Sequence, residues 1–136
     1  MISYQSLFDL AIKGLKNAYA PYSHFQVSAA VLMKHGEIYH GVNVENASYG
    51  ASICAERSAF VQAISSGQRE FQAIAIVATK DNQLKEATPC GICLQFMHEF
   101  SDDLDIIIGV DSDNLRIYKI TELLTNGFCL SGKEEK

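Results

Sequence analysis

The stretch FQAIAIVAT, residues 71–79, is almost wholly apolar, and it constrains the fold more than any other part of the chain. An apolar run of this kind predicts a central strand that is covered on both faces. Helical patterns flank it at residues 54–65 and 90–100, and a second buried strand, LDIIIGV, follows at residues 104–110. Helices that alternate with buried strands predict a three-layer α/β/α sandwich around a mixed sheet.

The remaining patterns complete a single domain over residues 1–136. They predict a helix over residues 5–19, strands over 25–33, 38–46 and 115–120, and a short helix over 120–124 with Thr121 as its N-cap. The pattern over 25–33 alternates, which is typical of a strand that is only half buried. Together these elements predict a mixed sheet of five strands with helices packed against it.

Charge and length disfavour several classes of protein. With 16 acidic and 11 basic residues the net charge is −5, which disfavours binding to a nucleic-acid backbone. No apolar run reaches membrane-spanning length, and residues 1–10 lack the pattern of a signal peptide. We therefore expect a cytoplasmic protein with neither membrane nor nucleic-acid partners. Its four cysteines should then be reduced, which favours a metal-binding or catalytic role over disulfides.

Three of these cysteines stand at the starts of two predicted helices. Cys54 begins one helix, and Cys90 and Cys93, in PCGIC, begin the next. If the strands and helices pair in the parallel manner, both starts emerge at one edge of the sheet, where ligand sites form. Helix N-termini lower the pKa of a thiol, and thiolates suit Zn²⁺. Three protein ligands leave a fourth position open, which is typical of a catalytic zinc rather than a structural one.

Two charged residues follow Cys54 within the same helical turn. Glu56 could reach a water at the open position without ligating the metal, and could move protons on and off it. Three thiolates and one Zn²⁺ sum to a net charge of −1, which weakens the metal as a Lewis acid. The guanidinium of Arg57 is placed to draw charge from the sulfurs.

Two other interpretations of the cysteines remain open at this point. CGIC resembles a thioredoxin-type redox pair, although that motif should follow the first strand of its own fold. A redox pair also leaves Cys54 and Glu56 unexplained. A structural zinc completed by Cys129 is the second possibility, but a lone cysteine is more often a small buried apolar residue.

The chain resembles the small zinc-dependent cytidine deaminases over nearly its whole length. The matching stretches are YAPYSHFQVSAA (19–30), GVNVENASYG (41–50), CAERSA (54–59), PCGICLQ (89–95) and ELLTNGF (122–128). The general zinc-deaminase signature is H-x-E followed by P-C-x-x-C, with a variant in which all three ligands are cysteine. In this chain Cys54, Ala55 and Glu56 stand for H-x-E. Five such stretches in order are far more specific than any one of them.

The resemblance implies the hydrolytic deamination of cytidine and 2′-deoxycytidine to the uridine products with release of ammonia, as in pyrimidine salvage. It implies that Cys54, Cys90 and Cys93 bind Zn²⁺. A water activated by the zinc would attack C4 of the base. Glu56 would take a proton from that water, pass it to ring N3, and then protonate the departing amine.

The resemblance also implies a set of residues that bind the nucleoside. The backbone N–H of Ala55 would hold the base carbonyl, and Phe25 would form an aromatic wall. Asn43 and Glu45 would hydrogen-bond the ribose; they alternate with valines, so both side chains can face one side of a strand. The short members are homotetramers with shared active sites, and Phe128 corresponds to an aromatic residue donated by a neighbouring subunit.

The chain departs from the family pattern at two positions. Leu94 stands where arginine is common, and Ser28 stands where glycine is common. Two alternative functions therefore remain: a deaminase of the same fold that acts on another cytosine-containing nucleoside, such as a nucleoside antibiotic, and a non-enzymatic zinc or redox protein. The intact stretch NVEN, residues 43–46, favours an ordinary nucleoside, and the intact Glu56 favours an enzyme.

Overall fold

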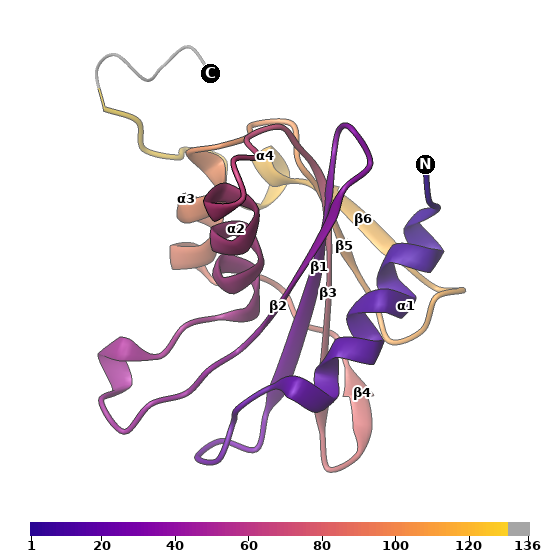
Figure 1. The fold of residues 1–136 in the computed structure, drawn as a ribbon, viewed down its shortest axis with the longest axis vertical. Coiled ribbons are helices and arrows are strands. Elements are labelled where there is room, and N and C mark those ends of the chain that lie inside the picture. The colour runs from indigo at the N-terminus through magenta and orange to yellow at the C-terminus, as the bar shows by residue number, and fades with distance from the viewer. Residues whose placement is uncertain (131–136) are drawn as a thin grey trace.

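A computed structural model describes residues 1–130 of the protein. One mixed sheet, seen edge-on in Figure 1, has α1 on one face and α2, α3 and α4 on the other. The helices are α1 (Tyr4–Gly14), α2 (Ala55–Ser65), α3 (Gly91–His98) and α4 (Ile120–Leu123). The strands are β1 (Gln26–Met33), β2 (Ile38–Val42), β3 (Phe71–Lys80), β4 (Gln83–Lys85), β5 (Asp105–Ile108) and β6 (Arg116–Lys119). The predicted three-layer α/β/α architecture is confirmed.

The direction of the strands places the starts of α2 and α3 together. The sheet has the order β2-β1-β3-β5-β6, with β4 paired to β3 outside this path. β2 and β3 are both antiparallel to β1, so they point the same way, and β3 is parallel to β5. α2 connects β2 to β3, and α3 lies in the connection from β3 to β5. Both helices therefore begin where β2 and β3 end, at the edge of the sheet where α/β folds form their sites.

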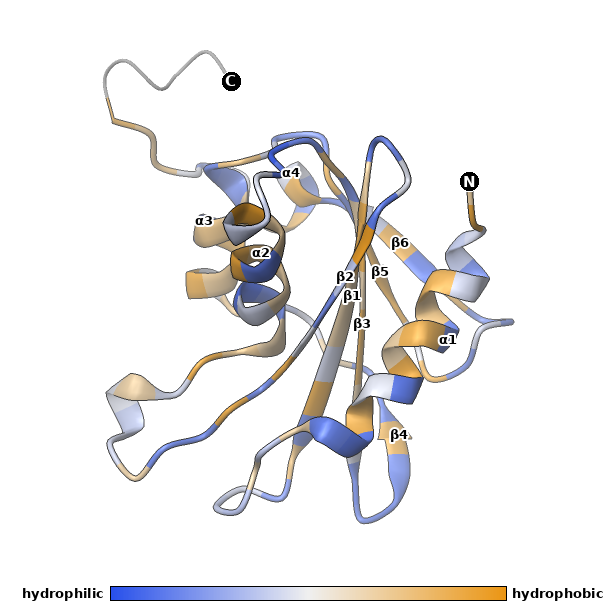
Figure 2. Ribbon diagram, in the orientation of Figure 1, coloured by the Kyte–Doolittle hydropathy of each residue, from blue (hydrophilic) through white to orange (hydrophobic). Residues whose placement is uncertain are grey.

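The two central strands are buried on both faces. For β3 this was predicted: Ala73, Ala75 and Val77 pack towards α1, and Ile74 and Ile76 pack towards α2 and α3. Figure 2 shows the resulting band of hydrophobic strand between the two helical layers.

For β1 the prediction of a half-buried strand is wrong. Every side chain from Ser28 to Met33 is buried, because β1 lies between β2 and β3 with α1 on one face and α2 on the other. Small alanines on this strand allow both helices to approach it closely. The alternation in the sequence therefore reflects the space available on each face and not exposure to water.

Several boundaries also differ from the prediction. The sheet has six strands within residues 1–130, because β4 forms a short hairpin with β3. Its two-residue loop, Asp81 and Asn82, has positive φ at both positions (55° and 62°), which these residue types tolerate. The first helix ends at Gly14 and continues only as a 3₁₀ turn, η1 (Leu15–Asn17).

Two further details of the prediction are wrong. Thr121 is not the N-cap of α4; it lies inside the helix, and the carboxylate of Glu122 accepts the Lys119 N–H at 2.7 Å at the helix start. The strand predicted over 38–46 ends at Val42, and beyond it Val44 forms only isolated bridges to Tyr19 and Ile53.

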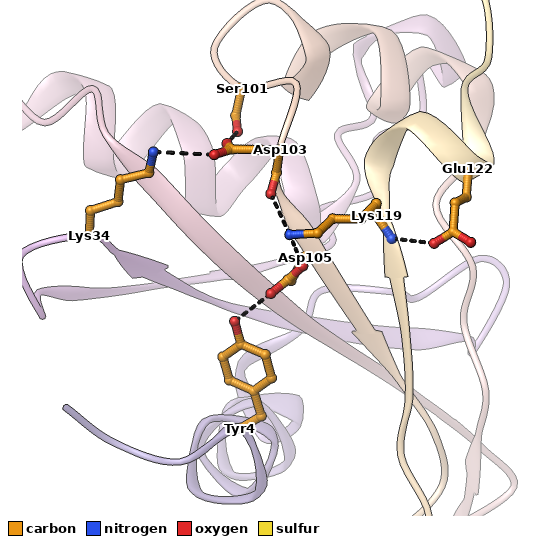
Figure 3. Close-up of polar contacts among 7 residues, drawn as sticks. All are labelled: Tyr4, Lys34, Ser101, Asp103, Asp105, Lys119 and Glu122. Atoms are coloured by element: carbon orange, nitrogen blue, oxygen red, sulfur yellow. Dashed lines mark hydrogen bonds and ion pairs between the residues drawn. The ribbon is translucent and has the colours of Figure 1, made fainter.

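A polar network ties α1 to β5 and β6 at the end of the sheet away from the starts of α2 and α3 (Figure 3). Tyr4 Oη donates to Asp105 Oδ2 at 2.6 Å, and Lys119 Nζ lies 2.7 Å from Asp105 Oδ1. Burial and this carboxylate raise the pKa of Tyr4. Asp103, nearby, accepts from Ser101 and pairs with Lys34. None of the helices within residues 1–130 is both long and apolar enough to cross a membrane.

Candidate active site and metal centre

Three thiols converge at the starts of α2 and α3, as predicted. Cys54 is the N-cap of α2, Cys90 is the N-cap of α3, and Cys93 lies in the first turn of α3. Their sulfur atoms all lie within 4.8 Å of one another. Among the described residues, 1–130, no other histidine, cysteine or carboxylate group is arranged to hold a metal ion. Cys129 is outside the cluster and lies beside His98 instead, so a site completed by Cys129 is not formed.

The pKa values of two of the thiols are shifted in opposite directions, so that one of them is readily deprotonated. Hydrogen bonds from Cys93 and, to a smaller extent, Arg57 lower the pKa of Cys54 to about 5, against the opposing effect of burial. The pKa of Cys93 is raised, because its proton is held between the two sulfurs and because the residue is buried. A thiolate is therefore present in this cluster at neutral pH. Soft sulfur donors in this number and spacing fit Zn²⁺.

Arg57 reaches the sulfurs, as its position in the sequence predicted. Its Nη2 donates to Cys54 Sγ at 3.8 Å. Burial would lower the pKa of Arg57, but its hydrogen bonds to Cys54 and Cys93 outweigh burial and raise it. Its Nε is buried without a hydrogen-bond partner among residues 1–130, so the guanidinium retains a donor for additional negative charge. Leu94, at the position where the family pattern commonly has arginine, is 6% exposed and packs in the core, so it brings no charge to the sulfurs.

Glu56 lies in the first turn of α2 and is only 5% exposed. Burial raises its pKa to about 7, and the charge of the Cys54 thiolate contributes in the same direction, against the stabilising hydrogen bond from its own backbone. A carboxyl group whose pKa is near neutral can both accept and release a proton at physiological pH. Its environment therefore suits the proton-transfer role that its spacing from Cys54 suggested.

An open cavity of about 390 Å³ lies against the thiol cluster. Its walls include Phe25, Asn43, Glu45, Ala55 and Glu56, together with two of the thiols. This volume is in the range of small-ligand sites. The predicted proton-transfer and substrate residues thus surround one cavity, with the exception of Phe128, and of the predicted metal ligands, Cys54 and Cys90 line it while Cys93 is buried behind them. Among the residues that line this cavity in the described part of the chain, Phe128 does not occur.

Asn43 is held rigidly at the cavity by the backbone of β1. Its Oδ1 accepts the Val27 N–H at 2.9 Å, and its Nδ2 donates to the Phe25 carbonyl at 2.8 Å. An amide nitrogen carries two N–H groups, so one remains for a ligand. Asn43 therefore orients the start of β1 and keeps a donor available at the cavity wall.

Ser23 was missed by the sequence reasoning, although it organises two cavity residues. Its hydroxyl donates to Glu45 Oε2 and accepts the Phe25 N–H at 3.0 Å. The N–H groups of Ser23 and Tyr22 donate to the other Glu45 oxygen. A serine hydroxyl in a turn often accepts the backbone N–H two residues further on, and this turn signal could have indicated the bond to Phe25. The bond to Glu45 spans 22 residues and has no local signal.

Comparison with known proteins agrees with this geometry. Residues 1–109 match the family model described as the cytidine and deoxycytidylate deaminase zinc-binding region. The chain belongs to this family. A cytidine deaminase of Halalkalibacterium halodurans is 42% identical over 91% of this chain and 92% of its own length. A blasticidin-S deaminase of Bacillus cereus is 29% identical over 77% of this chain and 78% of its own length.

Solved structures support the same family. A cytidine deaminase structure from Burkholderia pseudomallei has a TM-score of 0.85 and 38% identity, and the match covers 93% of this chain and all of that one. A cytidine deaminase structure from Mycobacterium tuberculosis has a TM-score of 0.82 and 33% identity, covering 96% of this chain and all of the other. The family is zinc-binding, and Cys54, Cys90 and Cys93 form the cluster that fits the ion. The cofactor is therefore zinc, and a redox disulfide is not needed to explain the CGIC motif.

Proposed function

We propose that this protein hydrolyses cytidine and 2′-deoxycytidine to uridine and 2′-deoxyuridine with release of ammonia. The observation that carries the proposal is the buried Glu56, with a pKa of about 7, beside three clustered thiols in a cavity of nucleoside size. The membership of the family and the cytidine deaminase relatives support the same reaction.

Each of the residues at the floor of the cavity has a defined task in this proposal. Cys54, Cys90 and Cys93 hold Zn²⁺, which when bound lowers the pKa of a water so that it can act as a nucleophile. The Glu56 carboxylate takes the proton of the attacking water and gives it to ring N3 of the base, and it then carries the proton of the new C4 hydroxyl to the departing amine, which leaves as ammonia. The N–H of Ala55, the first residue of α2, has no partner within the helix. It would donate a hydrogen bond to the base carbonyl, and the partial positive charge of the helix N-terminus would strengthen that bond.

The walls of the cavity bind the sugar and the base. Asn43 offers its remaining N–H, and Glu45 offers a carboxylate to the ribose hydroxyls. The hydrogen bond from Ser23 lowers the pKa of Glu45, so this acceptor stays ionised at neutral pH. Phe25 packs against the base. This sugar-binding pair favours an ordinary nucleoside over the nucleoside-antibiotic alternative.

We also propose that the protein acts in pyrimidine salvage in the cytoplasm as a homotetramer with shared active sites. Phe128 is 65% exposed and lies outside the cavity of its own chain, which supports a role in the cavity of a neighbouring subunit. There the ring would stack on the nucleoside base, an interaction worth about 1–3 kcal/mol.

An ultraviolet assay tests the reaction directly. The purified, zinc-loaded protein is incubated with cytidine, 2′-deoxycytidine, free cytosine and blasticidin S, and the loss of the cytosine chromophore is followed. Both nucleosides should be deaminated efficiently. Free cytosine should react poorly, because it lacks the sugar that Asn43 and Glu45 bind. Turnover of blasticidin S in preference to cytidine would contradict the proposed substrate.

A mixed assembly tests the shared site. Phe128→Ala subunits should have a raised KM, and Glu56→Gln subunits should be almost inactive. When the two variants are coexpressed, some sites combine an intact Glu56 from one chain with an intact Phe128 from the other. Activity should then exceed the sum of the two pure variants. Averaged activity in confirmed mixed tetramers, or a monomer in sedimentation, would contradict the shared site.

A further inference from the structure

A single side chain of α3 holds both backbone groups of Phe128. Gln95 Oε1 accepts the Phe128 N–H at 2.9 Å, and Gln95 Nε2 donates to the Phe128 carbonyl at 2.8 Å. One amide therefore completes both hydrogen bonds of one residue, as a neighbouring strand would. Such a two-point contact fixes the orientation of the residue as well as its position.

His98 aligns the residues on either side of Phe128. A Cβ atom added at Gly127 would lie 2.5 Å from His98 Nε2, so a larger residue here would have to displace the imidazole ring. On the other side, Cys129 Sγ lies 3.7 Å from the same nitrogen. Gln95 and His98 are three residues apart on α3 and so lie on one face of the helix. Three consecutive residues of the C-terminal segment, 127–129, are thus fixed in register on this face.

The contact fixes the backbone of Phe128 and leaves its ring projecting. The residue is 65% exposed although both of its backbone groups are bonded. Ile92, three residues before Gln95 on the same helix face, is 67% exposed. An exposed aromatic ring on a fixed backbone is preorganised for a partner surface, because the backbone does not have to be ordered on binding.

We infer that Gln95 is a positioning residue for Phe128, and that it acts on the active site of a neighbouring copy of the chain and not on its own zinc centre. This inference rests on the shared site described under the proposed function. Gln95 lies two residues from the zinc ligand Cys93, so its position in the sequence alone points to its own metal centre. The hydrogen bonds point instead to the C-terminal segment and, through it, to the neighbour.

Substitution of Gln95 should raise KM much more than it lowers kcat. Stacking by Phe128 binds the base in the ground state and the transition state alike, and the loss of such uniform binding appears in KM. Gln95→Leu, which removes both hydrogen bonds, should raise KM about ten-fold, within the range that base stacking supplies. Gln95→Glu, which keeps the acceptor and loses the donor, should give an intermediate KM. Zinc content should equal that of wild type, and Gln5→Leu, an exposed glutamine on α1, serves as the matched control.

A double substitution separates this role from any other. If Gln95 acts only through Phe128, Gln95→Leu should change KM less than about two-fold in a Phe128→Ala background. KM effects that multiply would overturn the inference while leaving the deaminase function and the shared site intact. A wild-type KM in Phe128→Ala alone would overturn both the shared site and the role of Gln95. Absence of any turnover of cytidine by the wild-type protein would show that the proposed reaction itself is wrong.

Coexpression of Gln95→Leu with Glu56→Gln gives the sharpest test. In these assemblies every active Glu56 belongs to a chain that lacks Gln95, whereas an intact Gln95 and Phe128 come from the other chain. If Gln95 acts on the neighbour, the mixed assemblies should gain sites with the wild-type KM. If it acts on its own zinc centre, every active site should keep the raised KM, and that result would overturn the inference.

Discussion

The two faces of the sheet are built from the same strands but bury different kinds of group. On the α1 face an apolar cluster lies beside the uncharged hydroxyl of Ser28, with Leu7, Phe8, Ala11 and Leu15 against Ala30, Leu32, Ala73, Ala75, Val77 and Ile107. On the other face, a cluster centred on the stacked rings of Phe60 and Phe71 also contains Cys93 and adjoins Glu56 and Cys54. One face therefore buries side chains without charge, and the other buries the Cys93 thiol and the Glu56 carboxyl group beside the partly buried thiolate of Cys54.

This difference separates stability from chemistry. A buried apolar side chain contributes to the folding free energy but carries no group that takes part in proton transfer or metal binding. Substitutions on the α1 face should therefore leave the active site unchanged. A buried ionisable group lowers stability unless it is paired, but it gains a pKa that suits proton transfer. Substitutions of ionisable residues at the starts of α2 and α3 should therefore lower activity strongly with little loss of stability.

The largest expected effect is that of Glu56→Gln on turnover. The amide keeps the size of the side chain but cannot carry a proton, and Glu56 takes part in several proton transfers. We expect kcat to fall by about 10⁴-fold, the upper end for a general acid–base. Zinc content by metal analysis should stay at the wild-type level, because Glu56 is not a ligand. A variant that loses its zinc but turns over normally when reloaded would contradict this role.

On the α1 face, Phe8→Ala should give the opposite result. Phe8 is fully buried between α1 and the sheet, and its truncation leaves a cavity. We expect the free energy of unfolding to fall by about 3–4 kcal/mol, measured by urea denaturation. kcat and KM per folded molecule should equal those of wild type. A change in KM for cytidine would show that the two faces are coupled.

The same comparison predicts that Glu56 destabilises the zinc-free protein above neutral pH. Its pKa is raised in the folded state, from an ordinary value of 4.5 to about 7. Between these values the folded state keeps a proton that the unfolded state releases, so stability falls as pH rises through this window and stays low above it. At pH 8 Glu56→Gln should therefore increase the free energy of unfolding of the zinc-free protein by about 3 kcal/mol.

This effect should disappear in acid. Below about pH 4 Glu56 is protonated in both states, and the two proteins should differ only by the small change of side chain. Urea unfolding of chelator-treated wild type and Glu56→Gln, from pH 4 to pH 8, measures the difference. If the unfolding free energies of the two proteins differed by a constant amount from pH 4 to pH 8, burial would not disfavour the charged form of Glu56.

A smaller effect is expected for Arg57→Gln. This substitution removes the guanidinium that donates to Cys54 Sγ, and losses of this kind weaken metal affinity by about 10- to 100-fold. The pH–rate profile should also shift to higher pH, because the uncompensated thiolates raise the pKa of the attacking water. Arg69→Gln removes the same charge from an exposed position and is the control. Unchanged zinc affinity would leave Arg57 with a packing role only.

The parts of the molecule that the sequence predicted are those with local signals. Cys54, Glu56 and Arg57 share one helical turn, so their mutual position follows from helix geometry, and the apolar run at 71–79 could only be a central strand. The position of Thr121 was misjudged because helix ends are set by a balance of nearby polar groups. Here the carboxylate of Glu122 satisfies the start of α4 instead.

Contacts between distant residues had no such signal. Gln95 meets Phe128 across 33 residues, and the bond from Ser23 to Glu45 spans 22. The burial of both faces of β1 likewise depends on α1 and α2, which lie on opposite sides of it. Alternation along one strand does not reveal how many layers pack against it, because small and large residues alternate for steric reasons too.

The smallest expected effect concerns Ser28, a polar residue whose side chain is fully buried on the α1 face. Its Oγ has no hydrogen-bond partner among residues 1–130, and a buried hydroxyl without a partner costs about 1–3 kcal/mol. Ser28→Ala should therefore stabilise the protein by about 1 kcal/mol without changing kcat or KM.

Gly14 faces this hydroxyl from the end of α1. A Cβ atom at Gly14 would lie 2.6 Å from Ser28 Oγ but 3.7 Å from Ser28 Cβ, which is ordinary contact. Gly14→Ala should therefore destabilise the wild type, although alanine is favoured over glycine in a helix by up to about 1 kcal/mol. In the Ser28→Ala background the clash is absent, and the same substitution should become neutral or stabilising. A double-mutant cycle by urea denaturation measures this change of sign. Equal effects of Gly14→Ala in both backgrounds would show that the hydroxyl does not set the approach of α1 to the sheet.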